Sequence, residues 1–314
     1  MSEFDLIRRH FTRATPGALL GVGDDAALLQ IPSGEVLAVS SDMLVSGTHF
    51  FPDADPYQLG HKALAVNLSD LAAMGATPRW ATLALSLPSA DEVWLERFSA
   101  GFFALARQHN VDLVGGDTTR GPLNLCVTIM GLVPAHQALR RTGARAGDAV
   151  WVSGKLGDAA LALAHLQGKL RLSEEELAAC APALHRPQPR VALGLALRGI
   201  ASSAIDISDG LLADMGHVLA ASGVAAELDY AALPISATLR KHSDWVQRCV
   251  LAGGDDYELC FTASPERNRD ILRIATEIAL PLSCIGQVVA GSGCVVHDAG
   301  GVSIQLKSGG YDHF

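Results

Sequence analysis

The sequence has no run of basic residues, no long hydrophobic run and no closely spaced cysteine pair. Its 24 lysines and arginines are outnumbered by 33 aspartates and glutamates, which gives a formal net charge of −9. Because nucleic-acid-binding proteins carry clustered basic surfaces, nucleic acid is not an expected partner. Nowhere do about 18 apolar residues follow one another, so no membrane contact is expected. The N-terminal MSEFDLIRRHF lacks the apolar region of a signal peptide, and we expect a cytoplasmic location.

The six cysteines include no CxxC motif and stand mostly in apolar stretches. This spacing argues against a zinc site, and the scattered positions argue against a disulfide framework. We therefore expect reduced thiols, mostly within the core.

The composition and the hydrophobic pattern predict two α/β domains. A chain of 314 residues with 49% hydrophobic content exceeds the usual size of a single core. Helical periodicity runs from Tyr57 to Met74, and Gly75 and Pro78 supply its end. Short apolar segments typical of strands surround it, at residues 36–40, 80–87, 111–114 and 125–133.

A polar, arginine-rich joint, AHQALRRTGARAGD, follows these segments at residues 135–148. We expect a domain boundary here, between an N-terminal domain of residues 1–137 and a C-terminal domain of residues 138–314. The second half is again expected to be α/β. Strands are predicted over 149–154 and 203–208 and near Leu259 and Cys284, and helices from about residue 157, over 191–197 and over 210–222.

Aspartates recur at the edges of apolar elements. Asp70 lies within the predicted helix, where aspartate is unfavourable, and its neighbours are apolar. Asp24 and Asp25 precede an apolar run, and we expect them against the interior, where an unpaired carboxylate would be costly. Six places share this feature: Asp24 with Asp25, Asp42, Asp70, Asp117, Asp206 with Asp209, and Asp255 with Asp256.

These aspartates allow two interpretations. Each of them alone could cap a helix or fix a turn, which is the commonest role of aspartate beside glycine. All six together are more typical of divalent-cation binding, because Mg²⁺ is held by one or two carboxylates together with substrate phosphates. Several ions imply a polyanionic substrate such as ATP. A calcium loop of the D-x-[DN]-x-[DN]-G type is absent from the sequence.

Phosphate-binding features are weaker. The sequence contains no G-x-x-x-x-G-K-[ST], which excludes a P-loop. VSGKLGD at residues 152–158 places Gly154 and Gly157 between a strand and a helix, where backbone amides could bind an anion or simply form a tight turn. Arg141 could bind phosphate or be a solvated linker residue.

Long motifs give the sequence a specific resemblance. GVGDDAALL, SSDMLVSGTHF, KALAVNLSDLAAMGATP, GGDTTRGPL, RRTGARAGD, AIDISDGLLADMGH, GGDDYELCF and GYDHF occur in this order. Their order and spacing resemble the thiamine-monophosphate kinase family, within the superfamily of aminoimidazole ribonucleotide synthetase and selenophosphate synthetase. The resemblance implies ATP-dependent phosphorylation of thiamine monophosphate to thiamine diphosphate. It also implies a homodimer whose N-terminal domains, with mixed sheets, pair into a barrel, and C-terminal α/β domains that complete the active-site cleft.

The resemblance also implies roles for individual residues. As magnesium ligands it implies Asp25, Ser40, Ser41, Asp42, Asp70, Asp117, Asp206 and Asp209, with Asp24 adjacent and less surely a ligand. As nucleotide contacts it implies Gly116, Asp117, Arg141 and Ser208, and as contacts of thiamine monophosphate His49, Asp255 and Tyr311. Ser41 stands where the family often has threonine, and Asp255 stands where glutamate is frequent.

The implied reaction needs no general base. The acceptor is a phosphate monoester, whose second ionisation lies near pH 6, so the nucleophile is already anionic at pH 7. We therefore expect no residue to act as a base, and expect Asp42, Asp70 and Asp117 to act through magnesium. An acidic residue and an aromatic ring suit the cationic thiazolium. In the absence of the resemblance, His49 and Tyr311 would be interpreted as packing residues.

Two alternatives remain open from the sequence. One is another ATP-using member of the superfamily, although selenophosphate synthetase has a reactive residue near its N-terminus and the first cysteine here is Cys126. Aminoimidazole ribonucleotide synthetase should lack the GYDHF ending. The other alternative is a non-catalytic protein that binds magnesium and nucleotide.

Overall fold

The chain divides into two compact units, which are described separately below. A computed structural model describes residues 3–304 and 310. The first unit comprises Met1–Leu71 and Ala76–His136, and the second comprises Ala72–Gly75 and Gln137–Phe314. Among the described residues, no helix is both long enough and apolar enough to cross a membrane.

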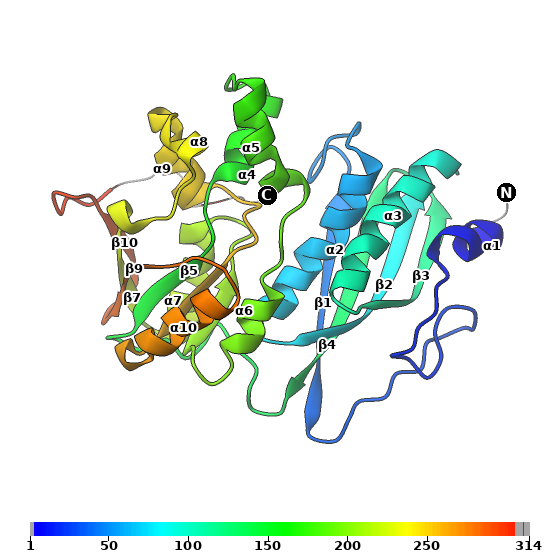
Figure 1. The fold of residues 1–314 in the computed structure, drawn as a ribbon, viewed down its shortest axis with the longest axis horizontal. Helices are drawn as coiled ribbons and strands as arrows, with labels where there is room; N and C mark the ends of the chain where they lie inside the picture. Colours follow the sequence, from blue (N-terminus) through cyan, green and yellow to red (C-terminus); the bar gives the residue numbers. More distant parts are fainter. Residues whose placement is uncertain (1–2, 305–309, 311–314) are drawn as a thin grey trace. The chain divides into compact units, whose positions relative to one another are not determined.

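The first unit is built on a four-stranded mixed sheet in the order β1-β4-β2-β3. The strands are β1 (Glu35–Val45), β2 (Thr77–Leu87), β3 (Asp112–Arg120) and β4 (Asn124–Pro134). Only the β2–β3 pair is parallel in this sheet. The helices α2 (Pro56–Ala73) and α3 (Glu92–Gln108) cover one face of it, and α1 (Glu3–Leu6) with the π-helix η1 (Ile7–Phe11) lies beside α3 (Figure 1).

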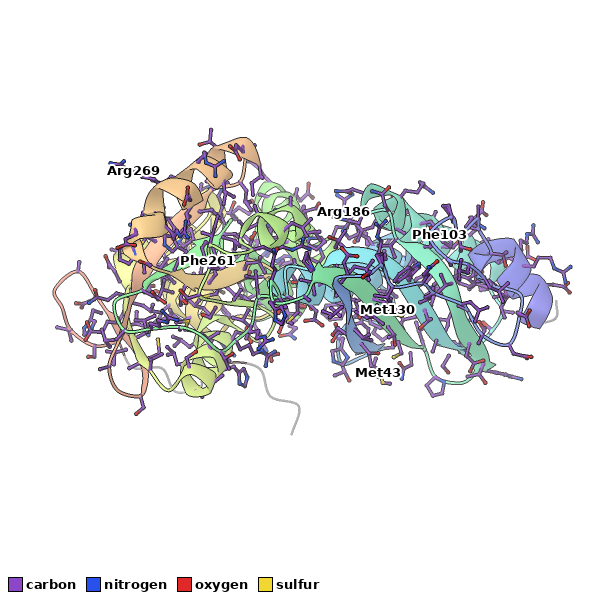
Figure 2. The ribbon with its side chains drawn as sticks, turned by 90° about the horizontal axis from the view of Figure 1, so that it is seen from below. Met43, Phe103, Met130, Arg186, Phe261 and Arg269 are labelled. Atoms are coloured by element: carbon purple, nitrogen blue, oxygen red, sulfur yellow. The ribbon has the colours of Figure 1, made fainter. Side chains whose placement is uncertain are left out.

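The alternation of side chains along the strands gives this sheet two different faces. On the face covered by helices, Leu83, Val127 and Ile129 are at most 5% exposed. On the opposite face, Val39 and Met43 are 57% and 54% exposed. Figure 2 shows Met43 and Phe103 of α3 on opposite sides of the sheet. The first unit therefore has a partly apolar sheet face that is open around Val39 and Met43, while Ala18, Ala27 and Leu29 cover it near Trp80.

The helices α2 and α3 approach each other closely because glycines stand at the contact. A Cβ atom on Gly60 would lie 2.0 Å from the carbonyl oxygen of Phe98. A Cβ atom on Gly101 would lie 1.9 Å from the carbonyl oxygen of Tyr57. The expected helix from Tyr57 to Met74 is confirmed as α2. Because most residues of α2 are buried, polar residues within it are unusual.

The second unit contains a six-stranded sheet in the order β10-β7-β9-β5-β8-β6. Its strands are β5 (Ala149–Ser153), β6 (Ser203–Asp206), β7 (Ala225–Asp229), β8 (Leu259–Ala263), β9 (Leu282–Val289) and β10 (Gly293–His297). Its helices are α4 (Asp158–Leu166), α5 (Glu174–His185), α6 (Val191–Ala196), α7 (Leu211–Ser222), α8 (Ala237–Arg240), α9 (Ser243–Ala252) and α10 (Asn268–Glu277), with 3₁₀ turns η2 (Tyr230–Ala232) and η3 (Pro265–Arg267). The expected α/β character of both halves is confirmed, with largely antiparallel pairing.

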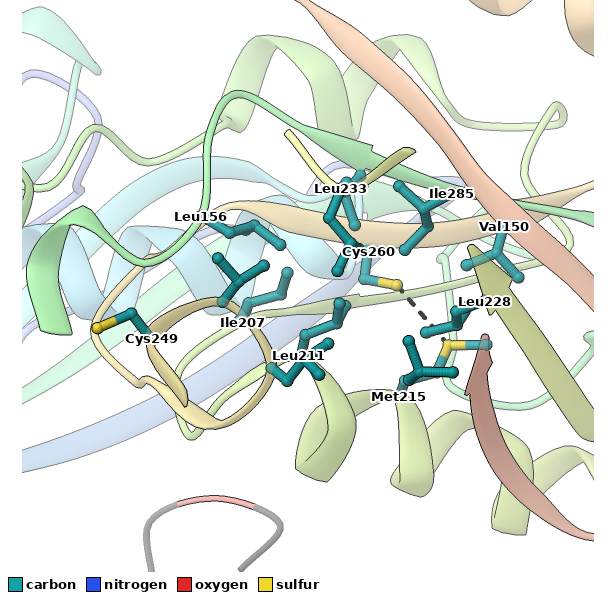
Figure 3. Packing of buried hydrophobic residues seen from close by; sticks show 14 of the residues in the cluster. Val150, Leu156, Ile207, Leu211, Met215, Leu228, Leu233, Cys249, Cys260 and Ile285 are labelled. Atoms are coloured by element: carbon teal, nitrogen blue, oxygen red, sulfur yellow. Dashed lines mark hydrogen bonds between the residues drawn. The ribbon is translucent and has the colours of Figure 1, made fainter. Parts of the chain in front are cut away.

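The core of the second unit is built from this sheet together with α4, α5, α7 and α9 (Figure 3). Within it, the Cys260 thiol donates a hydrogen bond to the Met215 sulfur at 3.7 Å. Burial raises the pKa of the Cys249 thiol to about 12. All six cysteines, each within the described range, are free thiols, as expected, and three are buried.

Two strands are longer than expected, and this changes the setting of two aspartates. We expected strands at 36–40 and 111–114, with Asp42 and Asp117 following them. In the structure β1 continues to Val45 and β3 to Arg120, so both aspartates lie inside strands. Since β1 and β3 are the two edges of the sheet, their polar and glycine residues are tolerated there.

Candidate active site

In the first unit, β1 and α2 bring three of the expected ligands together. Ser40 and Asp42 are two residues apart in β1 and share the face turned toward α2. The Ser40 hydroxyl donates a hydrogen bond to the Asp70 carboxylate. The backbone N–H of Asp42 donates to the Asn67 side-chain oxygen at 3.1 Å. Asn67 and Asp70 are three residues apart on α2, and such positions are neighbours on a helix surface.

Asn67 is a site residue that the sequence reasoning missed. It is 0% exposed, and its Nδ2 atom donates to the carbonyl oxygen of Ala63 at 3.0 Å. Its side-chain oxygen accepts the hydrogen bond from the backbone N–H of Asp42, so Asn67 holds β1 against α2 at this position. The signal was available, because Asn67 is polar within the apolar stretch that precedes Asp70.

Ser41 and Asp117 lie on the open face of the sheet, opposite the face that carries Ser40, Asp42 and Asp70. The Ser41 hydroxyl forms a hydrogen bond with the Thr128 hydroxyl at 2.9 Å, on the open face. Asp117 of β3 pairs with Ala84 of β2, Ala84 pairs with Cys126 of β4, and Cys126 pairs with Met43 of β1. Asp117 therefore lies on the same open face as Met43. Gly116 beside it has a φ of +149°, and a Cβ atom there would lie 1.9 Å from the Leu83 carbonyl oxygen. Only glycine therefore fits at this position of β3.

The expected burial of Asp24 and Asp25 is wrong. Both residues are exposed, and the backbone N–H of Asp25 donates to the Asp24 carboxylate at 3.0 Å. They lie in the segment between η1 and β1, where isolated bridges join Val22 with Asp24 and Leu20 with Leu28. Because both carboxylates are exposed to solvent, they need no buried partner.

His49 lies in the turn that follows β1. Its Nδ1 atom accepts a hydrogen bond from the backbone N–H of Val45 at 3.0 Å. This contact sets the direction of the imidazole ring and leaves Nε2 as its other polar atom. His49 is half-buried, so it does not behave as a fully packed core residue.

In the second unit, one buried carboxylate organises the loop between β6 and α7. Asp214 is 3% exposed, and one of its oxygens accepts hydrogen bonds from the backbone N–H groups of Ser208, Asp209 and Gly210 at 3.0, 3.1 and 3.1 Å. Burial raises the pKa of this carboxyl to about 6, and the three N–H donors act in the opposite direction. Asp214 thus holds the loop that carries two expected site residues.

The main chain of Ser208 is fully engaged by other protein groups. Its N–H donates to Asp214, and its carbonyl oxygen accepts from the N–H of Asp255 at 2.9 Å. If Ser208 contacts a nucleotide, its hydroxyl is therefore the group that can do so.

The segment before β8 is strained and is bonded to the same loop. Asp255 and Tyr257 have φ angles of +70° and +49°, which are uncommon for residues with side chains. The N–H of Tyr257 donates to the carbonyl oxygen of Ile207 at 2.8 Å, next to the bond between Asp255 and Ser208. These contacts gather Asp255 and the loop from Asp206 to Asp209 into one constellation.

In the turn VSGKLGD, the N–H groups of Gly154, Leu156 and Gly157 are already bonded within the protein. The N–H of Gly157 donates to both carboxylate oxygens of Asp256, at 2.9 and 3.0 Å. The N–H groups of Gly154 and Leu156 donate to Pro281 and Pro234 carbonyl oxygens, each at 2.9 Å. The carboxyl group of Asp256 therefore occupies this helix N-terminus, and the turn serves structure.

Asp256 provides a pH-dependent contribution to stability. Burial, followed by the neighbouring Glu258, Asp158 and Asp255, raises its pKa well above 3.8, while the Gly157 N–H opposes the rise. The folded protein binds this proton at a pH where the unfolded chain remains ionised. The contribution of Asp256 to the free energy of unfolding should therefore rise as the pH falls from about 7 to about 5.

Denaturant titrations at several pH values check this prediction. The difference in unfolding free energy between the unchanged protein and Asp256→Asn should grow as the pH falls over this range. Asp229→Asn is the matched control, because Asp229 is an exposed residue of the same unit that caps η2. Parallel pH profiles for the unchanged protein and Asp256→Asn would contradict the assignment.

The remaining expected residues are placed as follows. Arg141 is exposed, and its carbonyl oxygen accepts a bond from the Ser222 hydroxyl at 3.1 Å. Asp206 ends β6 and is 5% exposed. Tyr311 lies outside the described residues. Gly310, which precedes it, lies against the loop after β6, since a Cβ atom there would be 2.9 Å from the Asp209 carbonyl oxygen.

The expected magnesium ligands are divided between the units. Asp25, Ser40, Ser41, Asp42, Asp70 and Asp117 belong to the first unit, and Asp206 and Asp209 belong to the second. Among residues 3–304 and 310, no three histidine, cysteine or carboxylate groups lie close enough together to hold a metal by themselves. The oxygen atoms of Ser40, Asp42 and Asp70 nevertheless match the preference of Mg²⁺, which takes few carboxylates and completes its shell with water and phosphate.

Comparison with known proteins identifies the family. Residues 23–133 match the N-terminal domain, and residues 145–299 the C-terminal domain, of AIR synthase related proteins. The thiamine-monophosphate kinase of Salmonella typhimurium is 51% identical over 319 residues, which cover 99% of this chain and 98% of that protein. This chain belongs to the thiamine-monophosphate kinase family.

Solved structures agree with this assignment. The crystal structure of thiamine-monophosphate kinase from Stenotrophomonas maltophilia has a TM-score of 0.86 and 52% identity, and 95% of each chain is covered. AaThiL complexed with AMPPCP and TMP has a TM-score of 0.79 and 31% identity, covering 99% of this chain and 96% of that chain. The fold is thus shared with thiamine-monophosphate kinases over nearly the whole of the compared chains.

Proposed function

We propose that this chain uses ATP to phosphorylate thiamine monophosphate to thiamine diphosphate. The observation that carries the proposal is the match, over nearly the whole chain, to thiamine-monophosphate kinases. The structure with AMPPCP and TMP adds a relative that holds both types of ligand. The oxygen atoms of Ser40, Asp42 and Asp70 suit the binding of cations, which a reaction between two polyanionic substrates requires.

We propose magnesium as the cofactor of this reaction. Bound Mg²⁺ neutralises charge on the phosphates of the nucleotide. The chain would hold several such ions, with ligands drawn from Asp25, Ser40, Ser41, Asp42, Asp70, Asp117, Asp206 and Asp209. Of these, Ser40 and Asp70 are already bonded to each other, and Asn67 holds the strand beside them.

The substrates themselves supply the nucleophile and the leaving group. An oxygen of the acceptor phosphate, anionic at pH 7, attacks the γ-phosphorus of ATP, the bond to the bridging oxygen breaks, and ADP leaves. No side chain has to remove a proton, so the chain's residues bind and orient. Gly116, Asp117, Arg141 and the Ser208 hydroxyl serve the nucleotide, and His49, Asp255 and Tyr311 serve thiamine monophosphate.

We further propose a homodimer in the cytoplasm. Leu37, Val39 and Met43 are 40%, 57% and 54% exposed on the open sheet face of the first unit. A second copy of this face would cover these side chains and give the barrel that the sequence resemblance implies. Six free thiols suit a reducing compartment.

Mass spectrometry of the products tests the activity directly. The purified chain is mixed with MgATP and thiamine monophosphate, and formation of ADP and thiamine diphosphate is expected. ATP hydrolysis without thiamine diphosphate, or thermal stabilisation by MgATP without any product, would contradict the proposal and favour another superfamily activity or a binding protein.

A second arm tests direct in-line transfer. Incubation with γ-labelled ATP in the absence of thiamine monophosphate should leave the protein unlabelled, because the acceptor's own oxygen is the nucleophile. A stoichiometric covalent label on the protein would contradict direct transfer.

A further inference from the structure

Tyr257 is placed next to a substrate-binding candidate by an unusual backbone. It follows Asp255 and Asp256 in the segment that leads into β8, and its side chain is largely covered, with the residue 9% exposed. Both Tyr257 and Asp255 adopt left-handed φ angles although neither is glycine. Such strained residues persist only where the surroundings hold them, and they cluster at functional sites.

The surroundings that hold the segment are specific. Two backbone hydrogen bonds tie Asp255 and Tyr257 to Ser208 and Ile207, at 2.9 and 2.8 Å. On the other side, Asp256 is anchored to Gly157. With the backbone fixed on both sides, the Tyr257 hydroxyl reaches back and donates a hydrogen bond to Oδ1 of Asp255 at 3.0 Å.

We propose that Tyr257 is a positioning residue that orients the Asp255 carboxylate toward the positive ring of the acceptor. A hydroxyl that donates to one carboxylate oxygen restricts rotation of the carboxylate without removing its charge. An oriented carboxylate attracts a nearby thiazolium cation more than one that samples several rotamers. This inference rests on the proposed function, and it extends the acceptor site to a residue that does not itself need to touch the substrate.

Replacement of Tyr257 by phenylalanine tests this role. Tyr257→Phe removes the hydroxyl and keeps the ring, so the segment should still fold. Loss of a hydrogen bond to a charged group should raise the KM for thiamine monophosphate about tenfold or more. The kcat and the KM for MgATP should stay within about twofold, because the substitution leaves the backbone bonds of this segment to Ile207 and Ser208 in place.

Two further variants separate positioning from structure. Tyr230→Phe makes the same chemical change at a half-buried tyrosine of the second unit and should leave the KM for thiamine monophosphate unchanged. In an Asp255→Asn background, Tyr257→Phe should have little additional effect on this KM, because the carboxylate that it orients is gone. Equal effects in both backgrounds would overturn the proposal.

A neutral acceptor provides the readout that a purely structural role would not move. In this analogue of thiamine monophosphate, the thiazolium nitrogen is replaced by carbon. The unchanged protein and Tyr257→Phe should bind it with the same affinity, while their affinities for the cationic acceptor differ. If Tyr257→Phe weakens both acceptors equally, or neither, the proposal fails. If the unchanged protein makes no thiamine diphosphate at all, the proposed function fails first and the inference with it.

Discussion

Replacing Asp70 by asparagine is expected to lower magnesium-dependent turnover by at least about 10²-fold while the fold is retained. Asp70 lies on α2, and its carboxylate accepts the Ser40 hydroxyl hydrogen bond. Asparagine has nearly the same shape and can still accept that bond through its remaining oxygen. It removes the negative charge, however, and this charge is what a cation beside Ser40 and Asp42 would require.

Steady-state kinetics with MgATP and thiamine monophosphate, together with circular dichroism, check this expectation. Asp91→Asn is a matched control, since Asp91 caps α3 by accepting the N–H groups of Val93 and Trp94 at 3.0 and 3.1 Å. It makes the same chemical change beside a helix of the same unit and should leave turnover unaltered. Near-normal activity of Asp70→Asn would show that Asp70 is not a ligand.

Local periodicity made α2 predictable. Apolar residues recur at helical spacing from Tyr57 to Met74, and the helix ends where Gly75 adopts a φ of +61°. The same local signals gave α6 and α7 to within a residue or two of their bounds. Asp70 stood out because it is an unfavourable residue within such a helix, and the structure gives it a partner from β1.

Strand pairing and other tertiary contacts determine the features of the fold that the local sequence pattern did not predict. The continuation of β1 through Ser40 and Asp42 depends on its pairing with β4, which no local pattern encodes. The same holds for Asp214, whose three N–H donors precede it in the loop and are assembled only when α7 begins at Leu211. In the sequence, Asp214 is an ordinary residue of a helical pattern.

The expected burial of Asp24 and Asp25 was wrong, and of the two interpretations left open for VSGKLGD the structure favours the tight turn. Asp24 and Asp25 are both exposed, and the Asp24 carboxylate accepts a hydrogen bond from the Asp25 backbone N–H, so their apolar neighbours did not indicate burial. The amide of Gly157 is bonded to Asp256, which stands about a hundred residues away in the chain. Contacts over such sequence separation follow from the sheet order and cannot be deduced from spacing.

The buried Glu258 and the partly buried Arg190 form an ion pair whose disruption should strongly destabilise the second unit. Glu258 is 4% exposed. Its Oε2 atom accepts bonds from Arg190 Nε at 2.6 Å and from the Ser153 hydroxyl at 2.5 Å, and its Oε1 accepts from the other guanidinium arm. The pair joins the end of β5, the start of α6 and the segment that carries Asp255. Arg190→Met leaves the carboxylate buried with only the serine, which should lower the free energy of unfolding by about 3–5 kcal/mol.

Urea denaturation of Arg190→Met, Glu258→Gln and the double variant measures this effect. The double variant should be less destabilised than Arg190→Met alone, because no uncompensated charge remains buried. Arg273→Met is the control: Arg273 pairs with Glu277 on α10 with both side chains more than half exposed, so its loss should cost less than about 0.5 kcal/mol. A loss below about 1 kcal/mol for Arg190→Met would mean that water or another donor reaches Glu258 when the guanidinium is removed. In that case the segment before β8 would owe its strained shape to its backbone bonds with Ile207 and Ser208 rather than to the ion pair.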